Sequence, residues 1–372
     1  MNEFALGVPP SLREHRFKLA APDAAKKEIE REDMRKQPIV LLSIAALAGA
    51  VLCLPANAAA TYTTFDPPDS LYTYPMSIQA GVIAGDFQDH IGYTHGFVRA
   101  EDGTITTFDP PNSNNTYVQA MNMDGVIVGY VDDANFVGHA LMRTPDGTIT
   151  AIEPKGAAAS YAFGIDRKGS IVGYYEDGAS KWHGFLRNPR GKSKSFDVPG
   201  STFMAVAGVS DRGGAIAGFY RDNKSVTHGF VRSKDGTIQT FDPAGSTFTE
   251  PYSIDDNGAV AGYYMDSSFM AHGFLRASDG SMTSFDAPGA ANGTYVNGMN
   301  SDGLIAGYYI DDVFAAHAFE RTKNGKIRTF DPPGSTGTYG QTADSSRSDH
   351  HGVIGFYDDN AGAAHGYLRV GD

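Results

Sequence analysis

The chain has 372 residues and a formal net charge of −13, from 30 lysines and arginines against 43 aspartates and glutamates. This acidity excludes a nucleic-acid partner, because phosphate binding needs a basic surface. It also argues against binding to an anionic membrane surface.

Residues 34–58 have the features of a signal peptide: a short basic region, an apolar core over 39–54 and small residues before a cleavage site after Ala58. Cleavage there removes the single cysteine, Cys53, and leaves a mature chain without disulfides. A retained membrane helix is the alternative, but the core is short for a span. We expect residues 1–33 to be a mis-assigned start or a disordered leader. The protein is therefore expected to be exported, to the periplasm or outside the cell.

The rest of the chain, residues 61–372, contains seven copies of one pattern. In each copy an aspartate is followed six residues later by a histidine, and the histidines recur at steps of 44 to 48 residues. This period indicates a repeat architecture. The pairs are Asp89/His95, Asp133/His139, Asp177/His183, Asp222/His228, Asp266/His272, Asp311/His317 and Asp359/His365.

Each copy contains four strand-like segments, which in the sixth copy are 294–299, 304–310, 317–321 and 326–330. Asn-Gly and Asp-Gly turns between such segments are strong hairpin signals. The mature chain begins with the Thr-Thr-Phe-Asp tail of a copy and ends with a copy that lacks this tail. We therefore predict an all-β fold, a seven-bladed β-propeller of four-stranded antiparallel blades, in which the N-terminal strand completes the last blade and closes the ring.

This topology places the Asp-x5-His hairpins and the Phe-Asp-Pro crossovers on one face, and the Asp-Gly turns on the other. An arginine four residues after each histidine is expected to close the Asp-Gly turn or to pair with a neighbouring blade. The crossovers supply a second carboxylate per copy: Asp66, Asp109, Glu153, Asp197, Asp242, Asp286 and Asp331. The hairpin and crossover carboxylates together make this face acidic.

The motif His317-Ala318-Phe319, with His-Gly-Phe or His-Gly-Tyr in five other copies, resembles the bacterial extracellular repeat family named for its His-Ala-Phe (HAF) motif. The resemblance covers residues 61–372 and includes the leader. It implies an exported repeat protein, without an assigned activity or catalytic residues. The chain departs from that pattern by favouring glycine after the histidine and by its Phe-Asp-Pro-Pro-Gly-Ser crossover.

The His–Asp pairs allow two interpretations. They could ligate metal or perform acid–base chemistry, or they could hold each blade by hydrogen bonds. A catalytic site is needed once and this pair occurs in every copy, so the structural role is favoured. Glycines before an aromatic pair, such as Gly262, are predicted to let neighbouring sheets pack closely.

The evidence for metals and cofactors in the sequence is weak. His350 and His351, in an insertion in the last copy, are candidate metal ligands, although a solvated loop is the favoured interpretation. An acidic face would suit calcium, but no loop has the spaced ligands of a calcium loop. We predict no cofactor.

Aromatic residues near the hairpin tips are predicted to form a ligand-binding rim by stacking on sugar rings or on an apolar partner, or else to cover their own hairpins. They are Tyr93, Phe136, Trp182, Phe269 and Phe314. No nucleophile motif or phosphate loop is present, and no catalytic residue is predicted. The leading hypothesis is a non-enzymatic module that binds a polysaccharide or an envelope protein. A lyase or hydrolase with its site at the central funnel and a structural surface or assembly component are the alternatives.

Overall fold

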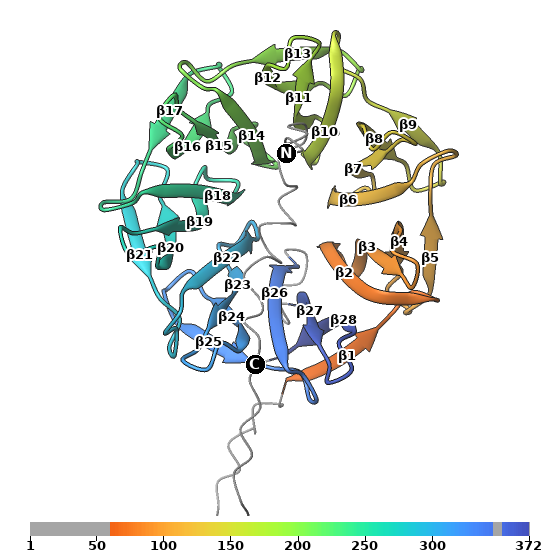
Figure 1. Ribbon diagram of the computed structural model, residues 1–372, viewed down its shortest axis with the longest axis vertical. Coiled ribbons are helices and arrows are strands. Elements are labelled where there is room, and N and C mark those ends of the chain that lie inside the picture. The colour runs from red at the N-terminus through yellow and green to blue at the C-terminus, as the bar shows by residue number, and fades with distance from the viewer. Residues whose placement is uncertain (1–59, 345–351, 372) are drawn as a thin grey trace, which may run out of the picture. The chain divides into compact units, whose positions relative to one another are not determined.

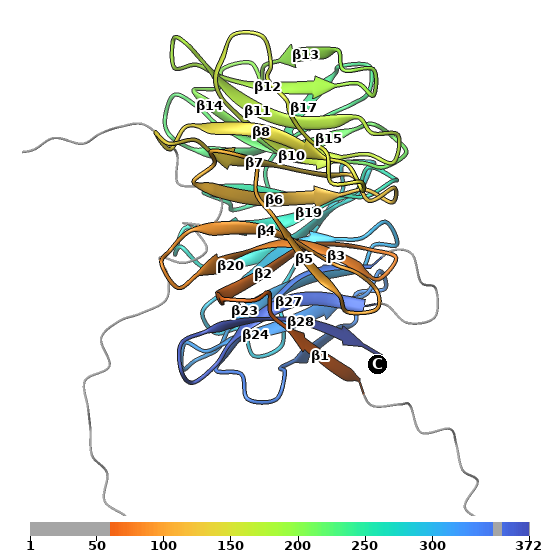
Figure 2. The ribbon, with the colours of Figure 1, turned by 90° about the vertical axis from the view of Figure 1, so that its right-hand side faces the viewer.

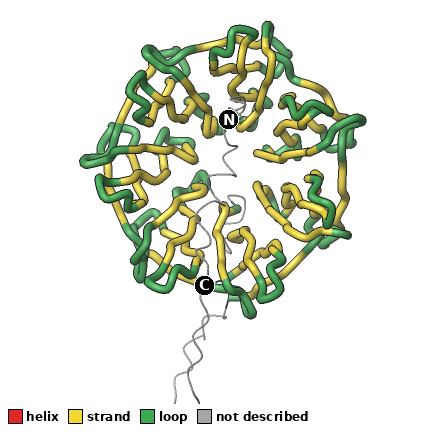
Figure 3. The backbone as a smooth tube through the Cα atoms, in the orientation of Figure 1, coloured by secondary structure: helices red, strands yellow, loops and turns green. Residues whose placement is uncertain are grey.

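The computed structural model describes residues 60–344 and 352–371, all within one compact unit, Asn57–Asp372. The regular structure in these ranges consists of 28 β-strands joined by loops (Figure 3). None of the described segments is a helix long and apolar enough to span a membrane. The predicted leader, Cys53, His350 and His351 lie outside the described residues.

The strands recur in groups of four. The first strands of the groups are β2 (Ser70–Gln79), β6 (Asn115–Met121), β10 (Ala157–Ile165), β14 (Phe203–Val209), β18 (Phe248–Ile254), β22 (Thr294–Met299) and β26 (Gly337–Ala343). The second strands are β3 (Val82–Asp89), β7 (Ile127–Asp132), β11 (Ile171–Asp177), β15 (Ile216–Arg221), β19 (Val260–Met265), β23 (Ile305–Ile310) and β27 (Gly352–Asp358).

The third strands carry the histidines. They are β4 (Thr94–Arg99), β8 (Gly138–Arg143), β12 (Trp182–Arg187), β16 (Thr227–Arg232), β20 (Ala271–Arg276), β24 (Ala316–Arg321) and β28 (Ala364–Val370). The fourth strands are β5 (Ile105–Phe108), β9 (Ile149–Ala151), β13 (Ser193–Phe196), β17 (Ile238–Phe241), β21 (Met282–Phe285), β25 (Ile327–Phe330) and, beside β28, the N-terminal strand β1 (Thr61–Phe65).

Strands within each group pair in antiparallel order, and the first strands lie nearest a common centre (Figure 1). Figure 2 shows the same sheets from the side, stacked one beside the next. A single parallel bridge joins β16 to β18, and another joins β28 to β2, so neighbouring sheets also touch through their backbones. β1 pairs with β28 from Thr61↔Val370 to Phe65↔Gly366. The all-β prediction is confirmed.

The core lies between the faces of neighbouring sheets. One cluster combines Val172 of β11 with Met204, Ile216 and Phe230 of the next sheet. Another combines Ile354 of β27 with residues of the sheet that begins at β2. This pattern explains why the second strands are buried almost throughout: both faces of each sheet are covered.

In five copies the arginine at the end of the third strand links its own turn to the preceding sheet. Arg276 donates from Nη1 to the carbonyl of Ala277 at 3.3 Å, and its Cζ lies 5.1 Å from the ring centroid of Phe241. Six copies have this cation–π contact with the preceding crossover phenylalanine, at 4.6–5.2 Å. Both expected roles of the arginine are therefore present together.

The glycine within each second strand is required inside its own sheet. A Cβ on Gly262 would collide with the backbone carbonyl of Glu250 on the adjacent strand, next to a β-bulge, and would lie 2.9 Å from the Phe274 ring. The prediction that these glycines serve contact between neighbouring sheets is wrong, because the close atoms belong to adjacent strands of one sheet.

In five copies a glycine follows the histidine and makes room for the crossover phenylalanine. A Cβ on Gly273 would lie 2.6 Å from Cζ of Phe285, the residue opposite it in the register. One of the two copies with alanine, Ala140, instead faces Ile152, whose N–H donates to the Ala140 carbonyl at 2.7 Å. In that copy isoleucine replaces the crossover phenylalanine, which leaves room for the methyl group of Ala140.

Candidate binding face

Each of the seven histidines lies between two carboxylates. Nδ1 is 2.6–2.9 Å from a crossover carboxylate. Nε2 is 3.2–3.7 Å from the aspartate of its own hairpin. The structure brings together the predicted pairs and adds the crossover carboxylate to each of them. In this order the bridges are His95–Asp109, His139–Glu153, His183–Asp197, His228–Asp242, His272–Asp286, His317–Asp331 and His365–Asp66.

In His95, His317 and His365 both ring nitrogens lie within hydrogen-bond distance of a carboxylate, and this geometry favours a protonated imidazole. An ionised carboxylate only accepts hydrogen bonds, and a neutral imidazole has one N–H, so only the imidazolium can donate to both neighbours. Burial opposes the charge on His95, but hydrogen bonds and charges from Asp109 and Asp89 outweigh it and raise the pKa of this histidine. The same balance raises the pKa of His317 and His365.

The second oxygen of the hairpin aspartate holds the hairpin tip. Asp266 Oδ1 accepts from the backbone N–H groups of Ser268 and Met270, at 2.7 and 2.9 Å. Backbone bonds of this kind hold the pKa of Asp266 below its usual value, with smaller contributions from His272. All seven hairpins have the same pair of bonds, so each tip is tied to a histidine through one carboxylate.

In three copies, those of Asp66, Asp109 and Asp242, the second oxygen of the crossover carboxylate reaches the next sheet. Asp242 Oδ1 accepts from Thr249 Oγ1 on β18 at 2.7 Å, while its Oδ2 lies 2.7 Å from His228 of the preceding sheet. Asp109 makes the same link to Thr116. Where this threonine is replaced by methionine, at Met204, Asp197 instead has Lys181 at 3.7 Å. The carboxylates that bond to this threonine therefore link one sheet to the next.

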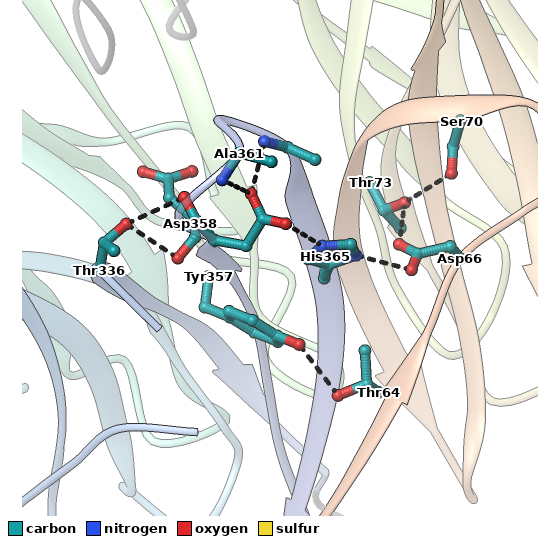
Figure 4. A network of polar contacts seen from close by, with 11 residues as sticks. Thr64, Asp66, Ser70, Thr73, Thr336, Tyr357, Asp358, Ala361 and His365 are labelled. Atoms are coloured by element: carbon teal, nitrogen blue, oxygen red, sulfur yellow. Dashed lines mark hydrogen bonds and ion pairs between the residues drawn. The ribbon is translucent and has the colours of Figure 1, made fainter. Parts of the chain in front are cut away.

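The copy that joins β1 to β28, near the two ends of the described residues, has the same arrangement (Figure 4). His365 Nδ1 lies 2.8 Å from Asp66 Oδ2, and Asp66 Oδ1 accepts from Thr73 at 2.7 Å. Tyr357 reaches Thr64 of β1 at 3.4 Å in the same view. In all seven sites both ring nitrogens of the histidine face a carboxylate. This repetition favours a structural role, in which each histidine holds its hairpin and its crossover together.

Four of the five predicted rim aromatics are exposed. The exposed fractions are 44% for Tyr93, 60% for Phe136, 80% for Phe269 and 68% for Phe314. Trp182 differs: it is half-buried, 5.3 Å from the Phe203 ring and 6.2 Å from the Tyr161 ring. It belongs to an aromatic cluster between sheets and is not one of the exposed residues at the hairpin tips.

Three of the exposed phenylalanines occupy one strained backbone position. Phe136, Phe269 and Phe314 have φ of 60°, 62° and 65° at the third residue after the hairpin aspartate. Left-handed backbone is unfavourable for a bulky side chain, and such strain concentrates at functional sites. The other copies have small residues there: Gly92, Ser180, Ser225 and Gly362. The aromatics were predicted from the sequence but the strain was not, although the glycines at this position in two other copies are a signal for left-handed backbone.

Two more apolar side chains, Ile91 and Val313, are exposed on the same tips. We call the exposed tip residues Ile91, Tyr93, Phe136, Phe269, Val313 and Phe314 the apolar rim. Across residues 60–344 and 352–371, no group of three or more His, Cys, Asp or Glu side chains is arranged to hold a metal ion. The face thus offers apolar side chains beside carboxylates.

Solved structures show which fold this is. The chain is similar to the β-propeller domain of the Trilobed protease from Pyrococcus furiosus, with a TM-score of 0.59 and 10% identity over 80% of this chain and 95% of that one. It is also similar to puromycin hydrolase, with a TM-score of 0.55 and 12% identity, covering 81% of this chain but 53% of the hydrolase. No protein-family model and no curated protein sequence matches the chain. The likeness establishes a β-propeller fold.

Proposed function

We propose that this protein is an exported, non-enzymatic, seven-bladed β-propeller that binds a glycan or a protein partner of the cell envelope through the apolar rim. The proposal includes membership of the HAF repeat family. The pairing of β1 with β28 and the Asp66–His365 contact support a ring closed by the N-terminal strand. The predicted signal peptide supports export.

One observation carries the binding role: three exposed phenylalanines stand where left-handed backbone favours glycine. Neighbouring copies fill the same position with glycine or serine, so the fold itself does not need an aromatic ring there. A strained, solvent-exposed ring that contributes little to folding is best explained by contact with another molecule.

An enzyme is the alternative, and one buried carboxylate favours it. Glu250 stands on a first strand, 2% exposed, where five other copies have tyrosine. The hydroxyl of Tyr263 donates to its Oε2 at 2.9 Å. This contact also satisfies the buried oxygen, so the binding role remains the better supported function.

The test uses the purified full chain and fragments of the cell envelope. The variant Phe136→Ser/Phe269→Ser/Phe314→Ser replaces each ring with serine, the residue that two other copies have at this position. We expect the wild type to be retained on the fragments and the triple variant to be lost, with an unchanged melting temperature. Met123→Ser is the matched control, because Met123 is exposed on a turn between first and second strands, at the opposite end of its sheet. Equal retention of the wild type and the triple variant would refute the proposal.

A further inference from the structure

We infer that the apolar rim binds an uncharged polysaccharide, by stacking the aromatic rings of separate hairpins, such as Phe269 and Phe314 on neighbouring sheets, on sugars of one polymer chain. The inference rests on the proposed binding function and names its ligand class. It follows from the isolation of the rings, their rigidity and the charge around them.

The rings are presented one at a time. Phe269 follows Ser267 and Ser268, and Phe136 follows Asn135, all of them exposed. Each ring lies on a separate hairpin, so the rim is a series of small apolar spots, the larger ones formed where Val313 adjoins Phe314 and where Ile91 lies near Tyr93. A protein interface has a contiguous apolar core with the polar groups at its edge. A sugar ring instead needs one aromatic face and nearby hydrogen-bonding groups.

The hairpins hold these rings rigidly. The N–H of Phe269 donates to the carbonyl of Asp266 at 3.1 Å, and the Asp266 side chain accepts from the residues on either side of the ring. The other oxygen of that carboxylate faces His272. Binding therefore immobilises little of the protein backbone, which lowers the entropic cost of holding a weakly interacting ligand.

Charge selects against acidic polymers. The side chains of Asp266, on the hairpin of Phe269, and of Asp286, on the other side of His272, are 35% and 51% exposed. Their oxygens can accept hydrogen bonds from sugar hydroxyls and repel carboxylate or sulfate groups. The hairpins that carry the three phenylalanines contain no lysine or arginine, whereas Lys181 and Lys224 lie on hairpins without them.

The same position on several blades suits a repeating ligand. A polymer that contacts two or more rings gains effective concentration, so its apparent affinity should exceed that of a two- or three-sugar fragment by about a hundredfold. Loss of one ring should weaken binding by about two- to tenfold, the usual worth of an aromatic contact.

The experiment separates envelope material into neutral polysaccharide, acidic polysaccharide and protein, and immobilises each fraction. Wild type, Phe269→Ser, the triple serine variant and Met123→Ser are passed over all three. We expect wild type and Met123→Ser to bind the neutral fraction, equally at low and high salt, since attraction to an uncharged chain is not screened. Phe269→Ser should bind it more weakly and the triple variant not at all.

Binding to the acidic fraction at equal strength would overturn the charge argument. Binding confined to the protein fraction, and lost in the triple variant, would overturn the inference and leave the proposed function standing. Absence of binding to all three fractions, by protein that melts cooperatively, would overturn both.

Discussion

Nδ1 of His365 lies 2.8 Å from Oδ2 of Asp66, although 299 residues separate the two along the chain. The distance equals that between His95 and Asp109, which are only 14 residues apart. A contact that elsewhere joins consecutive segments thus joins the two ends of the described chain. Because β1 is also paired with β28 along its whole length, the ends are held by backbone and side-chain bonds together.

Asp66→Ala tests this closure. Asp242→Ala is its matched control, because both aspartates bridge a histidine and a threonine at 2.7–2.8 Å. Each variant strands two polar partners, which costs about 1–3 kcal/mol. If β1 closes the ring, Asp66→Ala also loosens the N-terminal strand, so its urea midpoint should be lower than that of Asp242→Ala and its N-terminus more rapidly cleaved by protease. Identical midpoints and cleavage would argue against closure by β1.

His228→Ala should lower stability by about 1–3 kcal/mol, because it leaves Asp222 and Asp242 without their shared partner. The ring contact with Tyr220, 5.2 Å between centroids, is lost as well. Lys224→Ala, on the same hairpin and exposed, is the control and should leave the melting temperature unchanged. If the histidine variant melts like wild type but loses its ligand, the histidines are binding residues and the structural role is wrong.

Stability should depend on pH in a direction fixed by the two kinds of group. The raised pKa of His95, His317 and His365 means that the folded chain binds protons before the unfolded one, so this stabilisation is complete below pH 6.5 and is lost as pH rises through the folded pKa. The hairpin aspartates have lowered pKa values, so their stabilisation holds above pH 3.8 and is lost as pH falls. The urea midpoint should therefore be highest between about pH 4 and 6.5.

Replacing these three histidines with glutamine should flatten the alkaline side of that profile and leave the acid side in place. A wild-type midpoint that rises from pH 6 to pH 8 would contradict the assigned role of the imidazoles.

Two glycine substitutions separate a backbone clash from a side-chain clash. In Gly262→Ala the new methyl group meets the carbonyl of Glu250, which cannot move without breaking the sheet, and we expect a loss of about 3–4 kcal/mol. In Gly273→Ala it meets the ring of Phe285, which can shift, as in the copy where Ala318 faces Phe330. A loss of about 1–2 kcal/mol is expected there. Urea denaturation measures both, and the reverse order would show that the ring is the more rigid neighbour.

Strand positions were predictable because the same pattern recurs in seven copies, so a weak strand or turn signal in one copy is resolved by the others. The predicted segments 294–299, 304–310, 317–321 and 326–330 differ by at most one residue from β22, β23, β24 and β25. The crossover carboxylates were identified in the sequence, but their contact with the histidines was not predicted, because they belong to a different motif. Counting back from the turn would have found it, since the pairing of Ala318 with Phe330 places Asp331 opposite His317.

Other features depend on atomic positions that no pattern contains. Trp182 is next to a hairpin in sequence, but packing turns it towards Tyr161 and Phe203. The left-handed backbone at Phe269 has only an indirect signal in the sequence, the glycine that two other copies have at this position, because a phenylalanine at a turn usually avoids that conformation. The reason for Gly262 depends on a bulge in β18, which only the strand register shows.

The central claim is that the histidine bridges hold the fold while the apolar rim binds. It is tested most directly by measuring melting temperature and envelope retention for His228→Ala and Phe269→Ser side by side. We predict that His228→Ala melts at a lower temperature and is retained like wild type while folded. Phe269→Ser should keep its stability within about 0.5 kcal/mol and be retained less. The opposite pattern, with stable but unretained His228→Ala and unstable but retained Phe269→Ser, would contradict the account.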